Sequence, residues 1–142
     1  MSLWQKYKQM KILFTFGGLP HYLNPILSKL NSIENIELVV VVPKKHYNTL
    51  GDGVKQSTSN INFEIIYLEE KKAFYGKHYF KELEKIITNK KIDIVVTIWP
   101  YILNFVFNLK LQKTIKKNNI RLIIKEIPFD VPTYKNTFKY YN

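Results

Sequence analysis

The chain of 142 residues contains no cysteine. This absence excludes disulfides, thiolate nucleophiles and zinc sites built from cysteine. The three histidines, His21, His46 and His78, are too far apart in sequence to form a His-x-x-x-His pattern. We therefore expect no metal site. Because the chain also shows no charged-then-apolar signal sequence, we expect it to be cytoplasmic.

The glycine patterns of two widespread phosphate-binding loops are missing as well. A dinucleotide fingerprint needs a third glycine and an acidic residue at the end of the second strand, where this chain has Pro43-Lys44-Lys45. A P-loop closes with Gly-Lys-Ser or Gly-Lys-Thr, and neither triplet occurs. The sequence thus argues against NAD, FAD and P-loop ATP hydrolysis, and we expect no cofactor.

Long hydrophobic runs and arginine are scarce. The longest apolar runs, around residues 38–43 and 92–99, are too short to cross a bilayer of about 30 Å as helices. Among the 22 basic residues only Arg121 is an arginine, although the net charge is +11. Since direct base recognition relies on arginine, we expect no nucleic-acid partner. The excess of lysine otherwise reflects either a compositional bias without function or a role at an anionic surface.

Alternating apolar segments predict an α/β fold. The runs at 37–42 and 92–98 are nearly continuous and β-branched, which is typical of parallel strands covered on both faces. Right-handed crossovers then predict a Rossmann-like, doubly wound parallel sheet of about five strands in the order 3-2-1-4-5, with helices on both faces. The domain is expected at 10–132, between a polar extension at 1–9 and a linker or truncated segment at 133–142. Strands are expected at 11–16, 36–42, 61–68, 92–99 and 120–127, and helices at 23–33, 76–89 and 101–117.

The segment 11–22 is the most informative part of the chain. It joins a strand to Gly17 and Gly18 and then to an amphipathic helix. Glycines at the end of a first strand let the backbone approach a ligand, and the helix that follows presents its positive end to an anion. A phosphate-bearing ligand is therefore predicted here.

In such a sheet, ligands bind at the carboxyl ends of the strands where the strand order reverses. The segments 17–22, 99–101 and 126–130 should meet at this edge. For each candidate a structural role is the alternative: the histidine as lining of a helical turn, the aromatic rings as packing residues, and the carboxylates as turn residues. The predicted cleft residues are His21, Tyr22, Trp99, Tyr101, Glu126 and Asp130.

A family resemblance is carried by residues 10–30, Met-Lys-Ile-Leu-Phe-Thr-Phe-Gly-Gly-Leu-Pro-His-Tyr-Leu-Asn-Pro-Ile-Leu-Ser-Lys-Leu, and by the later Ile-Glu-Leu-Val-Val-Val-Val-Pro. The chain resembles the N-terminal domain of GT-B glycosyltransferases, most like family 4, over most of residues 10–132. The resemblance implies an acceptor-side domain whose Gly17 and Gly18 approach the donor diphosphate. It also implies a nucleotide-sugar donor held by a domain outside this chain, and a saccharide or lipid-linked acceptor.

Two departures leave the stereochemistry open. Many family members carry a histidine just after the fourth strand, where this chain has Trp99-Pro100-Tyr101. The segment 21–25 is similar to the His-x-Asn-Pro of inverting family 1 enzymes, with one residue inserted, and this likeness makes His21 the candidate catalytic base. Retention and inversion are both open at this point.

Three functions fit the sequence. The chain is the acceptor-side half of a glycosyltransferase and inactive alone, an acceptor-binding subunit of a split glycosyltransferase, or a non-enzymatic Rossmann-like module that binds a small molecule. Self-association is expected if the cleft edge is uncovered. Lys77, Lys81 and Lys85, spaced along the expected helix 76–89, predict peripheral contact with the inner face of an anionic membrane. The alternative for these lysines is a solvated helix face.

Overall fold

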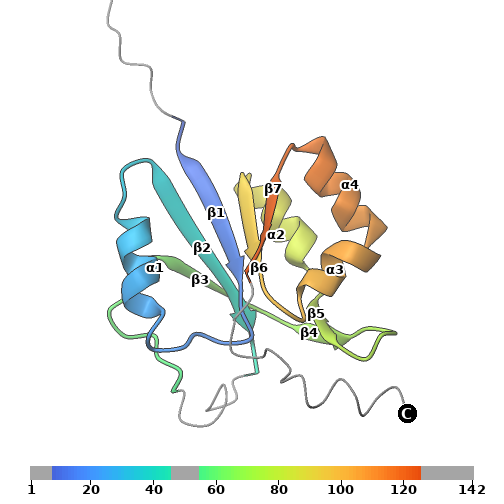
Figure 1. The fold of residues 1–142 in the computed structure, drawn as a ribbon, viewed down its shortest axis with the longest axis horizontal. Helices are drawn as coiled ribbons and strands as arrows, with labels where there is room; N and C mark the ends of the chain where they lie inside the picture. Colours follow the sequence, from blue (N-terminus) through green and yellow to red (C-terminus); the bar gives the residue numbers. More distant parts are fainter. Residues whose placement is uncertain (1–7, 46–54, 126–142) are drawn as a thin grey trace, which may run out of the picture.

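The computed structural model describes residues 8–45 and 55–125. Five strands form one parallel sheet in the order β3-β2-β1-β6-β7 (Figure 1). The predicted order is confirmed, because β6 and β7 are the fourth and fifth strands of the prediction, and the arrangement is consistent with a Rossmann-like fold. The strands are β1 (Met10–Thr15), β2 (Ile36–Pro43), β3 (Glu64–Leu68), β6 (Ile94–Thr97) and β7 (Arg121–Ile124).

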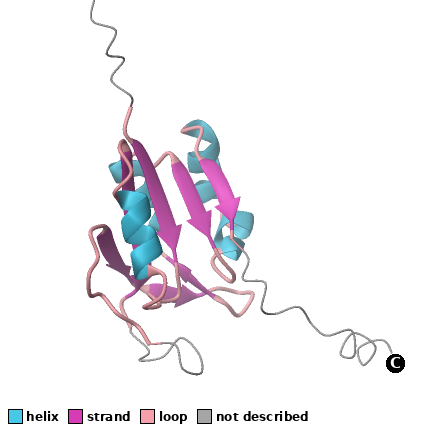
Figure 2. Ribbon diagram, turned by 60° about the vertical axis from the view of Figure 1, so that its left-hand side comes forward, coloured by secondary structure: helices cyan, strands magenta, loops and turns pink. Residues whose placement is uncertain are grey.

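Helices cover both faces of the sheet, as predicted (Figures 1 and 2). Alternation along β1 sends Ile12 toward the side of α1 and Leu13 toward the other three helices, so each face has its own apolar core. The β-branched run of β2 is buried on both faces, which is typical of a central parallel strand. The helices are α1 (Asn24–Asn31), α2 (Leu83–Lys90), α3 (Ile102–Phe107) and α4 (Leu109–Lys117).

The predicted helix at 76–89 is wrong in its first half. That half belongs to an antiparallel hairpin of β4 (Glu70–Lys72) and β5 (His78–Phe80), and α2 begins only after it. Gly76 lies in the hairpin turn with φ of 77°, a conformation that favours glycine. Phe80 stacks on the ring of Tyr101 with centroids 4.5 Å apart. This long-range contact outweighs the helical spacing of the apolar residues.

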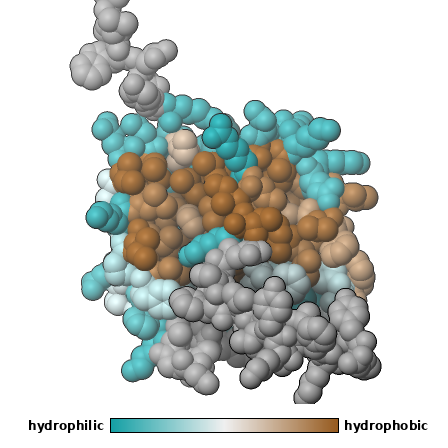
Figure 3. Space-filling view, in the orientation of Figure 1, coloured by the Kyte–Doolittle hydropathy of each residue, from teal (hydrophilic) through white to brown (hydrophobic). Residues whose placement is uncertain are grey.

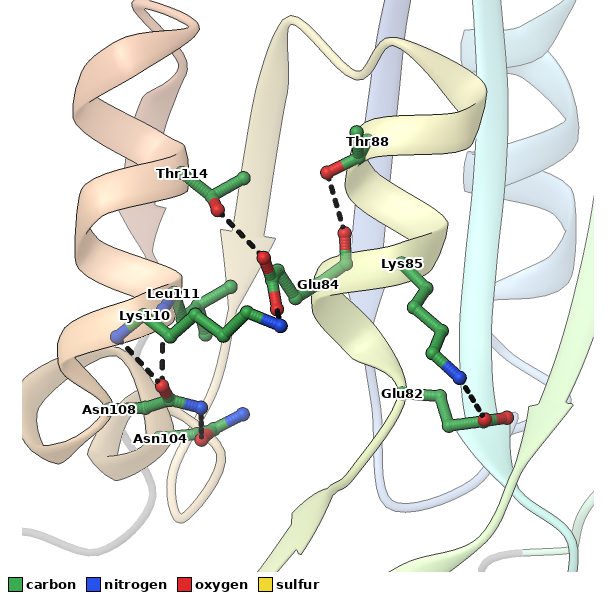
Figure 4. Close-up of polar contacts among 9 residues, drawn as sticks. All are labelled: Glu82, Glu84, Lys85, Thr88, Asn104, Asn108, Lys110, Leu111 and Thr114. Carbon is green, nitrogen blue, oxygen red and sulfur yellow. Dashed lines mark hydrogen bonds and ion pairs between the residues drawn. The ribbon is translucent and has the colours of Figure 1, made fainter.

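The predicted helix at 101–117 is two helices, separated at Asn108 (Figure 4). The Asn108 backbone is extended, and its Oδ1 accepts hydrogen bonds from the N–H groups of Lys110 and Leu111. An asparagine in this conformation is a favourable N-cap, so the chain starts a second helix instead of continuing the first. Within residues 8–45 and 55–125, no helix is long and apolar enough to cross a membrane.

Among the described residues, α1 covers only part of its face of the sheet. In the described part of the chain, no helix packs over β6 and β7 on this side, where Figure 3 shows a continuous hydrophobic surface. Ile123 of the edge strand β7 pairs with Val96 and is about half exposed. The Nζ atom of Lys125 lies 5.9 Å from the centroid of the Phe16 ring at the carboxyl end of this face.

Candidate functional site

The strand order reverses between β1 and β6, which pair in parallel at the centre of the sheet. Their carboxyl ends are joined by Thr15 and Thr97, whose hydroxyl oxygens are 2.8 Å apart in a fully buried hydrogen bond. This bond fixes the points from which two loops leave the sheet, the loop at 16–23 and the loop at 98–101. Ligands of doubly wound sheets bind where two such loops diverge.

Gly17 brings the first loop against the second. A Cβ atom at position 17 would lie 3.4 Å from the Oη atom of Tyr101, whereas the φ angle of Gly17 lies outside the left-handed region. The two loops therefore lie close together here, with room for little more than a methyl group at position 17, and the backbone angle does not require a glycine. The structure thus places two of the predicted site residues side by side.

The backbone N–H groups of Gly17 and Gly18 are the groups that the sequence predicts to approach a phosphate. Among the described residues, no acceptor receives a hydrogen bond from either N–H. The N–H of the preceding Phe16, in contrast, donates to the Val41 carbonyl. Free backbone N–H groups can donate hydrogen bonds to a bound anion. Gly18 is buried and Gly17 is partly exposed, so Gly17 is the more accessible of the two.

Tyr101 is buried between the loop and the hairpin. Its hydroxyl donates a hydrogen bond of 2.5 Å to Glu70 Oε1. Burial raises the pKa of Tyr101 well above its ordinary value, and the bond to Glu70 and the negative charge of Glu70 add to the increase. The phenol is therefore neutral at physiological pH and holds the loops in position. The sequence alone does not indicate this role of Glu70, because its partner Tyr101 lies 31 positions away.

Trp99 differs from Tyr101 although both were predicted at the cleft. Its side chain is 61% exposed, and the Lys77 Nζ atom lies 6.0 Å from the ring centroid. A planar exposed ring beside a cation can stack on a sugar or on another flat apolar surface. Trp99 is thus exposed at this edge, as is Tyr22, whose side chain is 50% exposed.

His21 is exposed and lies against the segment at 55–57. Its backbone N–H donates to the Lys55 carbonyl at 3.0 Å, and its Nδ1 is 3.1 Å from the same oxygen. Because a carbonyl only accepts, Nδ1 is the donor of this contact, and in the neutral ring with this tautomer Nε2 carries the lone pair. The His21 ring contacts Tyr22 edge-on at 5.7 Å. Among the described residues, no hydrogen bond, ion pair or ring contact joins His21 to Trp99 or Tyr101.

Asn24, at the start of α1, is a further candidate that the sequence prediction did not include. It is buried, and its Nδ2 donates to the Ser57 carbonyl at 2.7 Å. Its Oδ1 is buried without a hydrogen-bond partner in the described part of the chain. An unsatisfied buried acceptor costs about 1–3 kcal/mol, so a water or a ligand hydroxyl would be bound favourably there. The only sequence signal was its place in the segment 21–25.

The predicted carboxylates Glu126 and Asp130 lie outside the described residues. Within residues 8–45 and 55–125, no group of three or more histidine, aspartate or glutamate side chains is placed to hold a metal ion. No protein-family model matches the chain, and no curated protein or solved structure matches it at a significant level.

Proposed function

We propose that this chain is the acceptor-side domain of a GT-B glycosyltransferase, which moves a sugar from a nucleotide-sugar donor to a saccharide or lipid-linked acceptor. The observation that carries the proposal is the pair of free N–H groups at Gly17 and Gly18, located where the strand order reverses. Backbone N–H groups at such a point bind phosphate without the help of a P-loop. In this proposal they approach the donor diphosphate.

The rest of the donor site belongs to a second domain, either further along the same polypeptide or on a separate chain. The resemblance of residues 10–30 to family 4 supports this division of roles. The exposed ring of Trp99 suits an acceptor sugar, because aromatic faces pack on the apolar faces of pyranose rings. In this proposal the two loops contact the acceptor, and transfer of the sugar also requires the second domain.

His21 is the candidate base in this proposal. The Lys55 carbonyl holds its Nδ1–H, so Nε2 can accept a proton from an acceptor hydroxyl. An inverting reaction needs such a base, whereas a retaining reaction does not. A matched pair of variants, His21→Gln and Tyr22→Phe, separates a loss of proton acceptance from a change at the neighbouring ring.

The test is an NMR titration of the ¹⁵N-labelled chain with UDP-glucose, with GDP-mannose and with inorganic phosphate. We expect weak binding of the nucleotide-sugars, with the largest shifts at the Gly17 and Gly18 amides. The variant Gly17→Val should lose these shifts because its side chain displaces the loop. The control Gly76→Asn adds a side chain in the hairpin turn, where no atom lies within 4 Å of the new Cβ, and should keep them.

Two outcomes would overturn the proposal. Shifts confined to residues outside the two loops would place the ligand elsewhere. A micromolar dissociation constant for the chain alone, equivalent to about 8 kcal/mol, would instead identify an autonomous nucleotide-binding module.

A further inference from the structure

The β4–β5 hairpin carries an exposed aromatic cluster together with the junction of α3 and α4. Phe74 is 86% exposed, and its ring lies edge-on to Tyr75 at 5.0 Å and to Phe107 at 5.4 Å. The three rings line a cavity of about 500 Å³. Leu109, which is 70% exposed, lines this cavity as well. Contiguous apolar groups left in water at this level mark an interaction surface.

The hairpin also has anchors outside this cluster. The inner side of the hairpin is anchored by the stacking of Phe80 on Tyr101 and by the bond from Tyr101 to Glu70. The turn is closed by backbone hydrogen bonds from Ala73 N–H to the Lys77 carbonyl and from Gly76 N–H to the Ala73 carbonyl. The exposed rings therefore lie on a hairpin that is held by contacts other than their own.

The surroundings of the cluster are basic. Lys71, Lys72 and Lys77 are exposed on the hairpin, whereas its one glutamate, Glu70, is turned inward to accept the Tyr101 bond. At the other rim, Lys110 pairs with Glu84 at 2.9 Å on the side of α2 (Figure 4). Three lysines of the hairpin thus face solvent beside the apolar rings, in a chain of net charge +11.

We propose that this hairpin docks on an anionic lipid bilayer. The rings of Phe74 and Phe107 and the side chain of Leu109 enter the headgroup region, and the three hairpin lysines face the lipid phosphates. An exposed apolar tip with a basic rim is the pattern of an interfacial anchor. The proposal does not depend on glycosyl transfer, although one of its lysines, Lys77, also lies 6.0 Å from the ring centroid of Trp99 in the second loop.

A bilayer fits this surface better than a saccharide does. The Tyr75 and Phe107 rings lie 5.0 Å apart and 31° from parallel, so each covers a face of the other. The amides at the cavity are also engaged, since Asn108 caps α4 and donates from Nδ2 to Asn104 Oδ1. The surface proposed here differs from the lysine-bearing helix predicted at 76–89. Lys77 lies on the hairpin and not on a helix, and Lys85 pairs with Glu82.

The test is co-sedimentation of the chain with phosphatidylcholine vesicles and with vesicles that also contain phosphatidylglycerol, at low and high salt. We expect binding to the anionic vesicles alone and release at high salt. The double variant Phe74→Ser/Phe107→Ser should weaken binding by at least about tenfold, because its side chains no longer enter the interface. Its matched control is Ile26→Ser, an exposed apolar residue on α1.

A second pair of variants tests how much the lysine charges contribute to vesicle binding. Lys72→Glu should weaken binding several-fold more than Lys29→Glu, which changes the net charge equally but lies on α1. Equal binding to both kinds of vesicle, or unchanged binding of the double serine variant, would overturn the proposal. Shifts of the Phe74 and Tyr79 amides by free oligosaccharides, without vesicle binding, would identify a sugar site instead.

Discussion

The hydroxyl groups of Thr15 and Thr97 form a hydrogen bond across the two central strands, and no solvent reaches either side chain. Replacing one threonine by valine keeps the shape but leaves the other hydroxyl buried with one bond fewer. We expect Thr15→Val and Thr97→Val each to lower the free energy of unfolding by about 1–2 kcal/mol. The double variant should cost less than the sum. Urea unfolding of the four proteins measures the coupling, and strict additivity would contradict it.

Gly17 should tolerate alanine and resist valine. An alanine Cβ at 3.4 Å from Tyr101 Oη is an ordinary contact, so its effect on stability should stay within about 1 kcal/mol. The branches of valine must displace the tyrosine, at a cost of about 1–3 kcal/mol. Tyr101→Phe removes the atom that is displaced and should recover part of the loss in the double variant. A Gly17→Val protein as stable as wild type would refute the contact.

The phenol of Tyr101 predicts a loss of stability in alkali. Its pKa is raised in the folded protein by burial and by Glu70, from an ordinary value of 10.0. Below about pH 10 both states keep the proton, whereas above it only the unfolded state releases the proton, so stability falls as the pH rises. Above pH 10, the free energy of unfolding of Tyr101→Phe should fall less steeply with pH than that of wild type. Below pH 10, both proteins should show the same dependence on pH. Identical slopes at all pH values would exclude the effect.

Asp93 predicts the opposite dependence in acid. Burial acts to raise its pKa, but hydrogen bonds from the Lys11 backbone N–H and the Lys8 ammonium, both 2.9 Å long, lower it below the ordinary value. A lowered pKa contributes stability above the unfolded value of about 4, which is lost as the pH falls through the folded value. Asp93→Asn should therefore be less stable than wild type at pH 7, and the difference should shrink as the pH falls below about 4. The exposed Glu34→Gln serves as the control, with no difference at either pH.

The sheet could be predicted because its signal is local. The β-branched run at 37–42 specifies a strand buried on both faces, and right-handed crossovers leave few orders for five such strands. The hairpin could not be predicted. Phe80 lies at helical spacing from the apolar residues of α2, and its stacking on Tyr101, distant in sequence, decides the local structure.

The candidate site was predicted at the level of loops rather than of side chains. The topological rule selected the segments 17–22 and 99–101, and the contact between Gly17 and Tyr101 joins them. The rule does not say which side chains face solvent, so it grouped the exposed Trp99 with the buried Tyr101. The burial of Tyr101 depends on Glu70 and on the hairpin. Their positions follow from the packing of the whole fold and not from a sequence motif.

Tyr101 gives the two proposed surfaces a common neighbour. Its hydroxyl lies against Gly17 and bonds Glu70 at the start of the hairpin, and its ring stacks on Phe80 at the end of the hairpin. A ligand that moves this ring from one side changes the energy of the other side. Such coupling is reciprocal, so whatever factor docking on lipid contributes to diphosphate affinity, diphosphate must return to lipid affinity. If both proposals hold, one buried phenol would link occupancy of the loop to attachment of the hairpin.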